Sequence, residues 1–175
     1  MTQISYQPAF DPYHAIFRAL QLREHGWLTN KIAFDALRIA DFFLLFPFFL
    51  AEKEVRLKPK HRKIKSVGEK YVAAKPYSRL PDRKTLFRRI EPFQIAALGS
   101  LVTSDLANSI EWADKLVLGT NSNLPADLSE KIELENRDNE ELIESILLLL
   151  TDYPVEGTNG LKHRTGLLEY RYDLT

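Results

Sequence analysis

The sequence predicts a mostly α-helical protein, a compact multi-helix domain with a small β element near the C-terminus. Apolar side chains recur three and four positions apart along most of the chain, which is the period of an amphipathic helix. Residues that favour helix starts precede several of these runs, as Asp11 precedes Pro12. β-prone residues gather in the tail, as LEYRY at 168–172. The 175 residues suffice for one hydrophobic core.

The stretch 29–51 predicts the central helix of this core. Its charged residues would share one stripe of a helix, and they are Lys31, Asp35, Arg38 and Asp41. The opposite stripe consists of Ala33, Leu37, Ala40 and Leu44. Residues 42–51 carry no charge, and this run is too short for a membrane span, which needs about 20 residues. A helix that is apolar nearly all round must be buried, so we expect Leu37, Ala40 and Leu44 in the core.

Five of the ten phenylalanines crowd into this stretch, and they are Phe42, Phe43, Phe46, Phe48 and Phe49. Pro47 lacks an N–H and disfavours a helical residue before it, which predicts a kink, or one helix ending and another starting. The simplest interpretation places all five rings in the core. A second interpretation is that the segment after Pro47 also faces another protein, with Phe46, Phe48 and Phe49 as the partner interface.

Shorter helices are expected on both sides of this element. Residues 12–25 predict an amphipathic helix that ends in a left-handed cap at Gly26, and Thr29 or Asn30 then caps the central helix. Further short helices are expected at about 65–74 and 82–90, the second of them capped by Asp82. Pro92 should start another helix, because proline favours a first helical position.

The second half of the chain predicts more helices and a docked tail. Ser104 or Asp105 can cap a helix that Gly119 ends. The stretch 124–132 suits a helix, although Ile132 and Leu134 could equally alternate in a strand. Asp138 and Glu141 indicate a capping box, and the helix after it would turn inward Leu142, Ile143, Ile146, Leu147 and Leu150. The tail residues expected to dock on the folded body are Leu167, Leu168, Tyr170 and Tyr172.

The formal net charge of zero hides a strong asymmetry along the chain. Residues 52–91 hold fourteen Lys/Arg against five Asp/Glu, a net charge of +9, and residues 92–175 hold six against fifteen, a net charge of −9. Such asymmetry can mark a partner surface. We expect a single domain over 1–175, in which helical modules at 1–51 and 81–175 could be joined by a basic connector at 52–80.

The basic segment supplies the candidate contact residues, which are Lys58, Lys60, Arg62, Lys63, Lys65, Arg83, Lys84, Arg88 and Arg89. Clustered cations attract nucleic-acid phosphates, and they suit an acidic protein face equally well. Two alternatives remain: a merely solvated loop, and internal pairing with the acidic half. Few aromatic residues lie among these cations, so stacking on single-stranded bases is weakly supported.

Motifs for catalysis or cofactor binding are missing from the sequence. The glycines Gly157, Gly160 and Gly166 lack the spacing of a phosphate loop, and the chain has no cysteine. Asp11 and His14 could share a metal, but a helix cap beside a hydrogen-bonded histidine is the simpler interpretation. We therefore expect no enzyme, no cofactor and no metal. The N-terminal residues do not resemble a secretion signal, so the expected location is cytoplasmic.

Three short words of the sequence resemble a known family: FDPYH at 10–14, DFFLLFP at 41–47 and RTGLLEYRYD at 164–173. With the longer segments around them, they resemble the type 5 middle component of bacterial ABC-three component systems. The resemblance implies an anti-phage or conflict module that pairs an SMC-like ABC ATPase with a middle protein and an effector-bearing protein. It also implies a winged-helix-like adaptor, whose wing hairpin could come only from Thr158-Asn159-Gly160.

The expected function is thus a non-enzymatic adaptor that bridges the SMC-like ATPase and the effector-bearing subunit, with DNA a further partner for the basic segment and no membrane contact. A first rival is a stand-alone helical DNA-binding protein. A second rival is an enzyme whose active site has no recognisable sequence motif. The residues that would have to cluster for such an enzyme are Asp11, His14, Asp35, Arg38 and Asp41.

Overall fold

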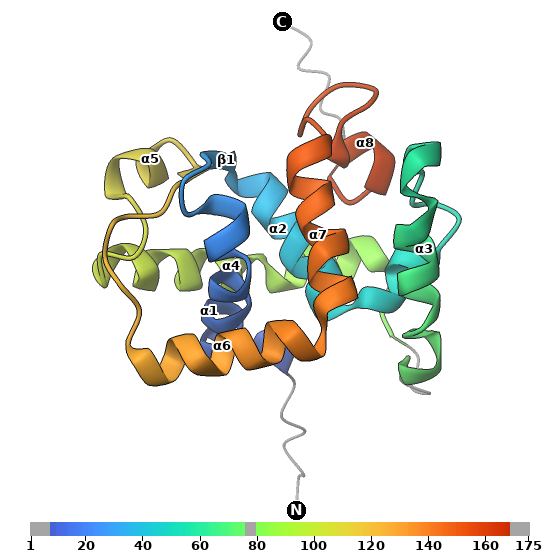
Figure 1. Ribbon diagram of the computed structural model, residues 1–175. Coiled ribbons are helices and arrows are strands. Elements are labelled where there is room, and N and C mark those ends of the chain that lie inside the picture. Colours follow the sequence, from blue (N-terminus) through green and yellow to red (C-terminus); the bar gives the residue numbers. More distant parts are fainter. Residues whose placement is uncertain (1–7, 76–79, 169–175) are drawn as a thin grey trace, which may run out of the picture.

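Helices form most of the chain in the computed structural model, which describes residues 8–75 and 80–168 (Figure 1). The α-helices are α1 (Pro12–Gln21), α2 (Phe34–Leu45), α3 (Arg62–Glu69), α4 (Arg83–Thr103), α5 (Ser109–Ala113), α6 (Ala126–Asp138), α7 (Glu140–Asp152) and α8 (Leu161–Thr165). A π-helix spans Arg23–Trp27, and 3₁₀ turns span Pro8–Phe10, Pro47–Ala51, Pro59–His61 and Val72–Ala74. Two short strands, β1 (Ile32–Ala33) and β2 (Leu116–Val117), pair antiparallel.

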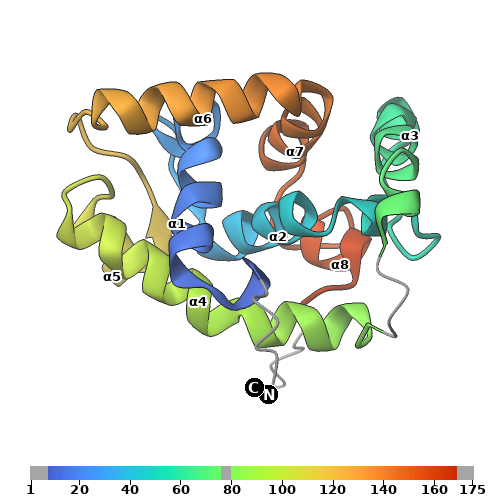
Figure 2. The same cartoon turned by 90° about the horizontal axis from the view of Figure 1, so that it is seen from below.

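The helix α2 lies in the middle of the molecule, where it packs against α1, α4 and α7. Figure 2 shows α6 and α4 on opposite sides, with α1 running between them. The helix α3 packs on the 3₁₀ turn after α2 and on α7. The buried apolar side chains form one cluster that extends in sequence from Ala9 to Leu167, and it includes Ile64 and Val67 of the basic segment.

The central helix is shorter than the sequence predicts, and two residues of its charged stripe are buried. It begins at Phe34 because residues 32–33 pair with β2, so Lys31 lies outside it. Arg38 and Asp41 are each only 4% exposed. Of the predicted core residues, Leu37 and Ala40 are buried, whereas Leu44 is half-buried at the edge of the cluster.

Pro47 acts as predicted, because α2 ends at Leu45 and a 3₁₀ turn begins at Pro47. The turn brings the last rings back onto the helix. The Phe42 and Phe49 rings stack with centroids 5.4 Å apart and planes 15° apart. This cluster of rings, with Phe87 of α4 edge-on to Phe42, fills the space between α2 and α4.

The first helix ends earlier than expected, and Gly26 is not a left-handed cap. The chain leaves α1 at Gln21 and continues as the π-helix, whose Gly26 faces α7. A Cβ on Gly26 would lie 3.3 Å from both Leu147 Cδ2 and Leu150 Cδ1. A glycine at this position therefore leaves room for the side chains of α7, which pack close to this turn.

The helix α4 runs unbroken through Pro92, although the sequence predicts two helices there. A proline inside a helix costs about 3 kcal/mol or more. Burial continues on both sides of it, through Phe87 and Ile90 before and Ala97 after, and this packing favours one long helix.

The next two predicted helix starts are also displaced. The α5 cap is Asn108, whose side-chain oxygen accepts the N–H groups of Ile110 and Glu111. Leu116, predicted to be helical, belongs to β2. The α7 helix begins without the expected capping box. Leu142, Ile143 and Ile146 are buried as predicted, whereas Leu147 and Leu150 are half-buried and Leu149 is buried instead.

The sheet of the described residues is not the predicted β element. It joins 32–33 to 116–117, whereas the predicted stretch 168–172 lies, apart from Leu168, outside the described residues. The stretch 158–160 forms no wing hairpin, because its turn leads into α8. Leu167 is buried and Leu168 packs against the core, as predicted for the tail, whereas Tyr170 and Tyr172 fall outside the described residues.

Candidate interaction surfaces

Six of the nine predicted basic contact residues are exposed, and all of these except Lys60 fall into two groups on α3 and α4. Arg62 and Lys63 lie on α3, and Lys84, Arg88 and Arg89 lie on the first turns of α4. We call these two groups the α3 strip and the α4 strip. Figure 2 shows α3 and the first turns of α4 at the same end of the molecule. The sequence correctly indicates exposed cations here, and their contact with a partner stays a prediction.

Asp82 fixes the start of the helix that carries the α4 strip. Its carboxylate accepts the Thr85 N–H at 3.0 Å and the Thr85 hydroxyl at 2.6 Å. These hydrogen bonds to Thr85 lower the pKa of Asp82 below its ordinary value. The cap was predicted from sequence, and it directs the exposed basic side chains outward from a defined helix.

The other four predicted cations contact the protein itself. Lys58 Nζ donates to the Asp152 carbonyl at 2.9 Å, and Lys60 Nζ lies 2.7 Å from the Asp152 carboxylate. Lys65 Nζ donates to the Glu52 carbonyl at 3.3 Å, and Arg83 lies 3.9 Å from the Glu52 carboxylate. Lys58 and Lys60 therefore contact the acidic half, as the alternative of internal pairing expects, whereas Lys65 and Arg83 contact Glu52 of the basic segment itself.

Asp152 and Tyr153 tie the basic connector to the end of α7. His61 is buried, with Nδ1 2.7 Å from the Tyr153 hydroxyl and Nε2 3.1 Å from the Asp152 carboxylate. The Tyr153 hydroxyl also accepts the Lys58 N–H at 2.9 Å. The hydrogen bond from Lys60 is the main cause that lowers the pKa of Asp152.

The proposed aromatic interface is largely occupied within the chain. Phe48 and Phe49 are 7% and 4% exposed, and Lys75 Nζ lies 5.5 Å from the centroid of each ring. Only Phe46 is half-buried. Buried rings cannot also cover a partner in this conformation, so Phe48 and Phe49 are core residues and Phe46 alone remains a candidate.

A buried polar cluster links α1, α2 and α4, and the sequence did not indicate it. Arg18 Nε lies 2.6 Å from Asp41 Oδ1, and Gln94 Nε2 donates to Asp41 Oδ2 at 2.7 Å. Arg38 Nε donates to the Gln94 side-chain oxygen at 3.1 Å. Burial lowers the pKa of Arg38, and the nearby Glu91 and Asp35 carboxylates oppose that shift.

The five residues of the enzyme hypothesis do not form one site, and the structure places them in separate contacts. Asp35 pairs with Arg38 at 3.6 Å and with Lys162 at 2.8 Å, while Asp41 belongs to the buried cluster. Asp11 caps α1 by accepting the Tyr13 N–H at 2.8 Å, and His14 lies on the exposed side of the same helix. Within 8–75 and 80–168 no three His, Asp or Glu side chains gather as a metal site would require.

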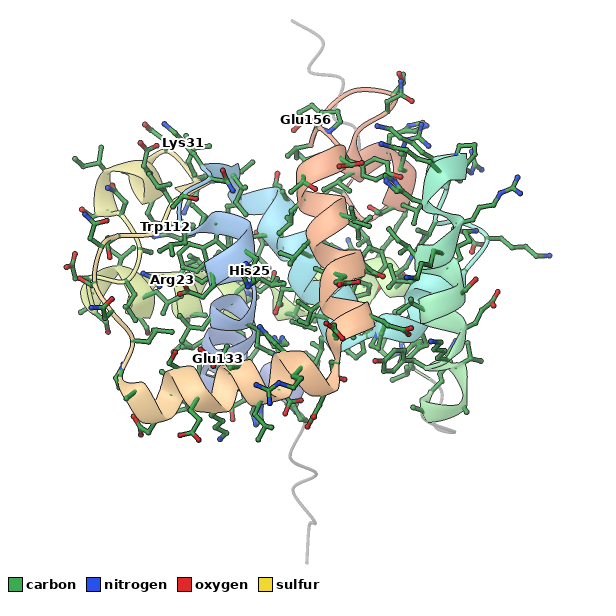
Figure 3. The ribbon with its side chains drawn as sticks, in the orientation of Figure 1. Arg23, His25, Lys31, Trp112, Glu133 and Glu156 are labelled. Carbon is green, nitrogen blue, oxygen red and sulfur yellow. The ribbon has the colours of Figure 1, made fainter. Side chains whose placement is uncertain are left out.

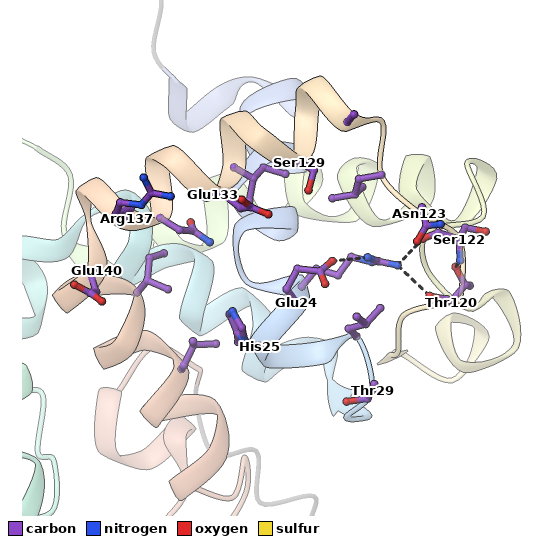
Figure 4. Close-up of a pocket in the computed structure, with 18 of the residues that line it drawn as sticks. Glu24, His25, Thr29, Thr120, Ser122, Asn123, Ser129, Glu133, Arg137 and Glu140 are labelled. Atoms are coloured by element: carbon purple, nitrogen blue, oxygen red, sulfur yellow. Dashed lines mark hydrogen bonds and ion pairs between the residues drawn. The ribbon is translucent and has the colours of Figure 1, made fainter.

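A cleft of about 1040 Å³ lies where the π-helix and the linker 119–125 face α6 and α7. Figure 3 shows Arg23, His25 and Glu133 gathered at this place, and Figure 4 shows the lining side chains. Polar and acidic groups form its rim, and Leu28, Ile132 and Leu147 contribute apolar surface. Sequence reasoning missed the cleft because its walls are far apart in the chain.

Arg23 holds one wall of the cleft. It is 2% exposed, and it donates to the carbonyls of Thr120 and Ser122, both at 3.0 Å, and pairs with Glu24 at 2.7 Å (Figure 4). Gly119 lets the linker approach the π-helix, because a Cβ there would lie 2.7 Å from the Leu28 carbonyl oxygen.

A reciprocal pair of amides joins α1 to α6 at the base of the cleft. Gln21 Nε2 donates to Asn136 Oδ1 at 3.1 Å, and Asn136 Nδ2 donates to the Gln21 carbonyl at 2.9 Å. Hydrogen bonds thus fix both walls of the cleft. They also give the buried polar groups of these walls the partners that such groups need.

The described residues define a mostly helical domain with two exposed basic strips and one large acidic-rimmed cleft. The family model of the ABC-three component (ABC-3C) system Middle Component 5 matches residues 4–173. The chain therefore belongs to this family of middle components. No curated protein and no solved structure matches the chain. None of the helices in 8–75 and 80–168 combines the length and apolar character needed to cross a membrane.

Proposed function

We propose that the chain is a non-enzymatic adaptor that joins an SMC-like ABC ATPase to an effector-bearing subunit in a bacterial defence complex. Membership of the middle-component family is the observation that carries this proposal. A cytoplasmic location accompanies it, since the complex would act on invading DNA or on its products inside the cell.

The distribution of side chains supports an adaptor. The polar groups brought together in the interior stabilise helix packing, as Arg18, Asp41 and Gln94 do between α1, α2 and α4. The accessible features are charged strips and a cleft, which suit protein or nucleic-acid contact. An adaptor needs at least two such surfaces, and the basic strips and the cleft share no residue.

Binary binding experiments test the proposal. The tagged chain should retain the ATPase of its system when the two are co-expressed alone, and likewise the effector-bearing subunit alone. A chain that retained neither, but bound DNA sequence-selectively by itself, would instead be the stand-alone DNA-binding protein. A turnover activity of the purified chain that is lost on substitution of Asp35 or His14 would favour an enzyme.

The two basic strips are the candidate contact for DNA phosphates or for an acidic face of one partner. Phosphate contacts weaken steeply as salt rises because counterions are released, whereas charge pairs between proteins change mainly the association rate. Replacing Arg62, Lys63, Arg88 and Arg89 by Glu should therefore abolish either DNA retention by the complex or binding of one subunit, and the salt dependence separates the two.

A further inference from the structure

We propose that the cleft between the π-helix, α6 and α7 binds a cationic amphipathic helix of a partner protein. Two features along the same walls carry this inference: an apolar floor, and a rim on which carboxylates outnumber cations. Figure 4 shows the rim groups Glu133 and Glu140 on one side of the opening, with Glu24 and His25 across from them.

The floor is apolar where its side chains are only partly buried. Leu28, Leu124 and Leu147 line the cleft and are half-buried, and the core residues Ile132 and Ile143 lie beneath them. An apolar strip of this kind suits side chains that recur on one face of a docking helix.

The rim carries net negative charge, because its four carboxylates outnumber the two lining cations, Arg23 and Arg137. Glu133, Glu140 and Glu144 line the cleft and are exposed, and in the described part of the chain no ion pair reaches them. The adjacent Glu141, by contrast, is paired with Lys70 outside the cleft. Carboxylates without a cation are complementary to lysine and arginine side chains flanking the apolar face of a ligand helix.

The shape of the cleft favours an elongated occupant over a compact one. Its wall on α6 extends from Ala126 to Arg137, which at 1.5 Å per residue is roughly 16 Å, or about three helical turns. The volume of about 1040 Å³ lies at the upper limit of the roughly 300–1,000 Å³ typical of small-molecule pockets.

The walls are held in place before any ligand arrives. Arg23 fixes the linker, and the Gln21–Asn136 amide pair fixes α6 on α1. A preformed groove spares a ligand the entropy cost of ordering its binding site. The π-helix itself supports the assignment, because such irregular turns occur frequently at functional sites.

A model peptide tests the inference directly, independently of whether the chain is an adaptor. The probe is a fluorescent lysine–leucine peptide of about 16 residues whose leucines recur at helical spacing. A control peptide of the same length carries glutamate in place of lysine. The lysine peptide should bind and the glutamate peptide should not. The triple variant Glu133→Lys/Glu140→Lys/Glu144→Lys should weaken lysine-peptide binding at least about tenfold, as expected when attractive charge pairs become repulsive.

A matched variant controls for net charge. Asp127→Lys/Glu130→Lys/Asp138→Lys makes the same change on exposed faces of α6 that do not line the cleft, and it should retain binding. Equal loss in both triple variants would overturn the proposal, because attraction would then depend on net charge alone. Circular dichroism of both variants confirms that each is folded before binding is compared.

The place where the lysine peptide binds can be tested as well, because the sequence has no cysteine and a single introduced thiol can be labelled alone. The only thiol of Ser129→Cys would lie in the cleft, and the only thiol of Ser66→Cys would lie on α3. The lysine peptide should protect the first from alkylation and leave the second unchanged. Equal protection at both thiols, or protection at neither, would overturn the inference. Concentration-dependent self-association that only the Glu133/Glu140/Glu144 variant loses would assign the cleft to a second copy of the chain instead.

Discussion

Arg18 of α1 and Asp41 of α2 form an ion pair in the interior, with Arg18 Nε 2.6 Å from Asp41 Oδ1 and both side chains less than a tenth exposed. Gln94 of α4 donates to the second oxygen of Asp41, so one carboxylate joins three helices. Buried pairs of this kind stabilise little by themselves, but removing one partner leaves an uncompensated charge.

Asp41→Asn should therefore lower the free energy of unfolding by about 3–5 kcal/mol. The double change Arg18→Met/Asp41→Leu should cost less than the single change, because neither charge then remains. Asp138→Asn, at an exposed site, should change stability by less than about 0.5 kcal/mol. Urea denaturation of the four proteins provides the comparison, and an Asp41→Asn midpoint equal to the control would contradict the buried-pair account.

Two glycines should respond to alanine in opposite directions. A Cβ on Gly68 would lie 2.7 Å from Leu50 Cβ and 2.8 Å from the Ala51 nitrogen, whereas a Cβ on Gly99 would meet nothing within 4 Å. Gly68→Ala should destabilise the packing of α3 on the turn after α2. Gly99→Ala, inside α4, should stabilise by about 0.5–1 kcal/mol. A Gly68→Ala melting temperature at or above that of the wild type would show that α3 does not pack so closely.

The core prediction for α2 now distinguishes two leucines. Leu37 is 2% exposed and Leu44 is half-buried. Leu37→Ala should cost about 2–5 kcal/mol, the usual range for a fully buried leucine, and Leu44→Ala should cost clearly less. The denaturation midpoints of the two variants measure which one loses more stability. A larger loss for Leu44→Ala would show that Leu44 is not at the edge of the core.

Asp152 should make stability depend on acid pH. Its pKa is lowered in the folded state, mainly by the hydrogen bond from Lys60, relative to about 3.9 in an unfolded chain. A lowered carboxyl pKa contributes stability that is complete above the unfolded value and is lost as pH falls through the folded value. Asp152→Asn should therefore melt below the wild type at pH 6.

That difference should shrink as the pH falls below about 4. The matched control is Asp114→Asn, because Asp114 is exposed and outside the ion pairs of the described residues. Melting temperatures of the three proteins between pH 6 and pH 2.5 measure the effect. A constant gap between wild type and Asp152→Asn at all pH values would rule out an electrostatic origin.

Local signals in the sequence located helices well and their ends less well. The caps at Asp11 and Asp82, and the break at Pro47, were predictable because each depends on the chemistry of neighbouring residues. The continuation of α4 through Pro92 was not, because burial on both sides of the proline outweighs its local preference. The short sheet was missed because strands of two residues are too short to show a hydrophobic period.

The candidate surfaces divide in a similar way. Exposed cations such as Arg62 and Arg88 follow from the charge pattern, but the pairing of Lys60 with Asp152 depends on two segments meeting in space. Arg23 shows the limit most clearly. It is an ordinary basic residue in the sequence, and yet it is buried and fixes the wall of the cleft.

Co-purification from cells with and without this chain tests the central claim most directly. The ATPase and the effector-bearing subunit of the system are co-expressed, the ATPase carries the tag, and the recovered effector is quantified. If the chain is the adaptor, the effector is recovered only when the chain is present, together with the chain itself. Recovery of the same amount of effector in its absence would show that the two partners bind each other directly and would contradict the account.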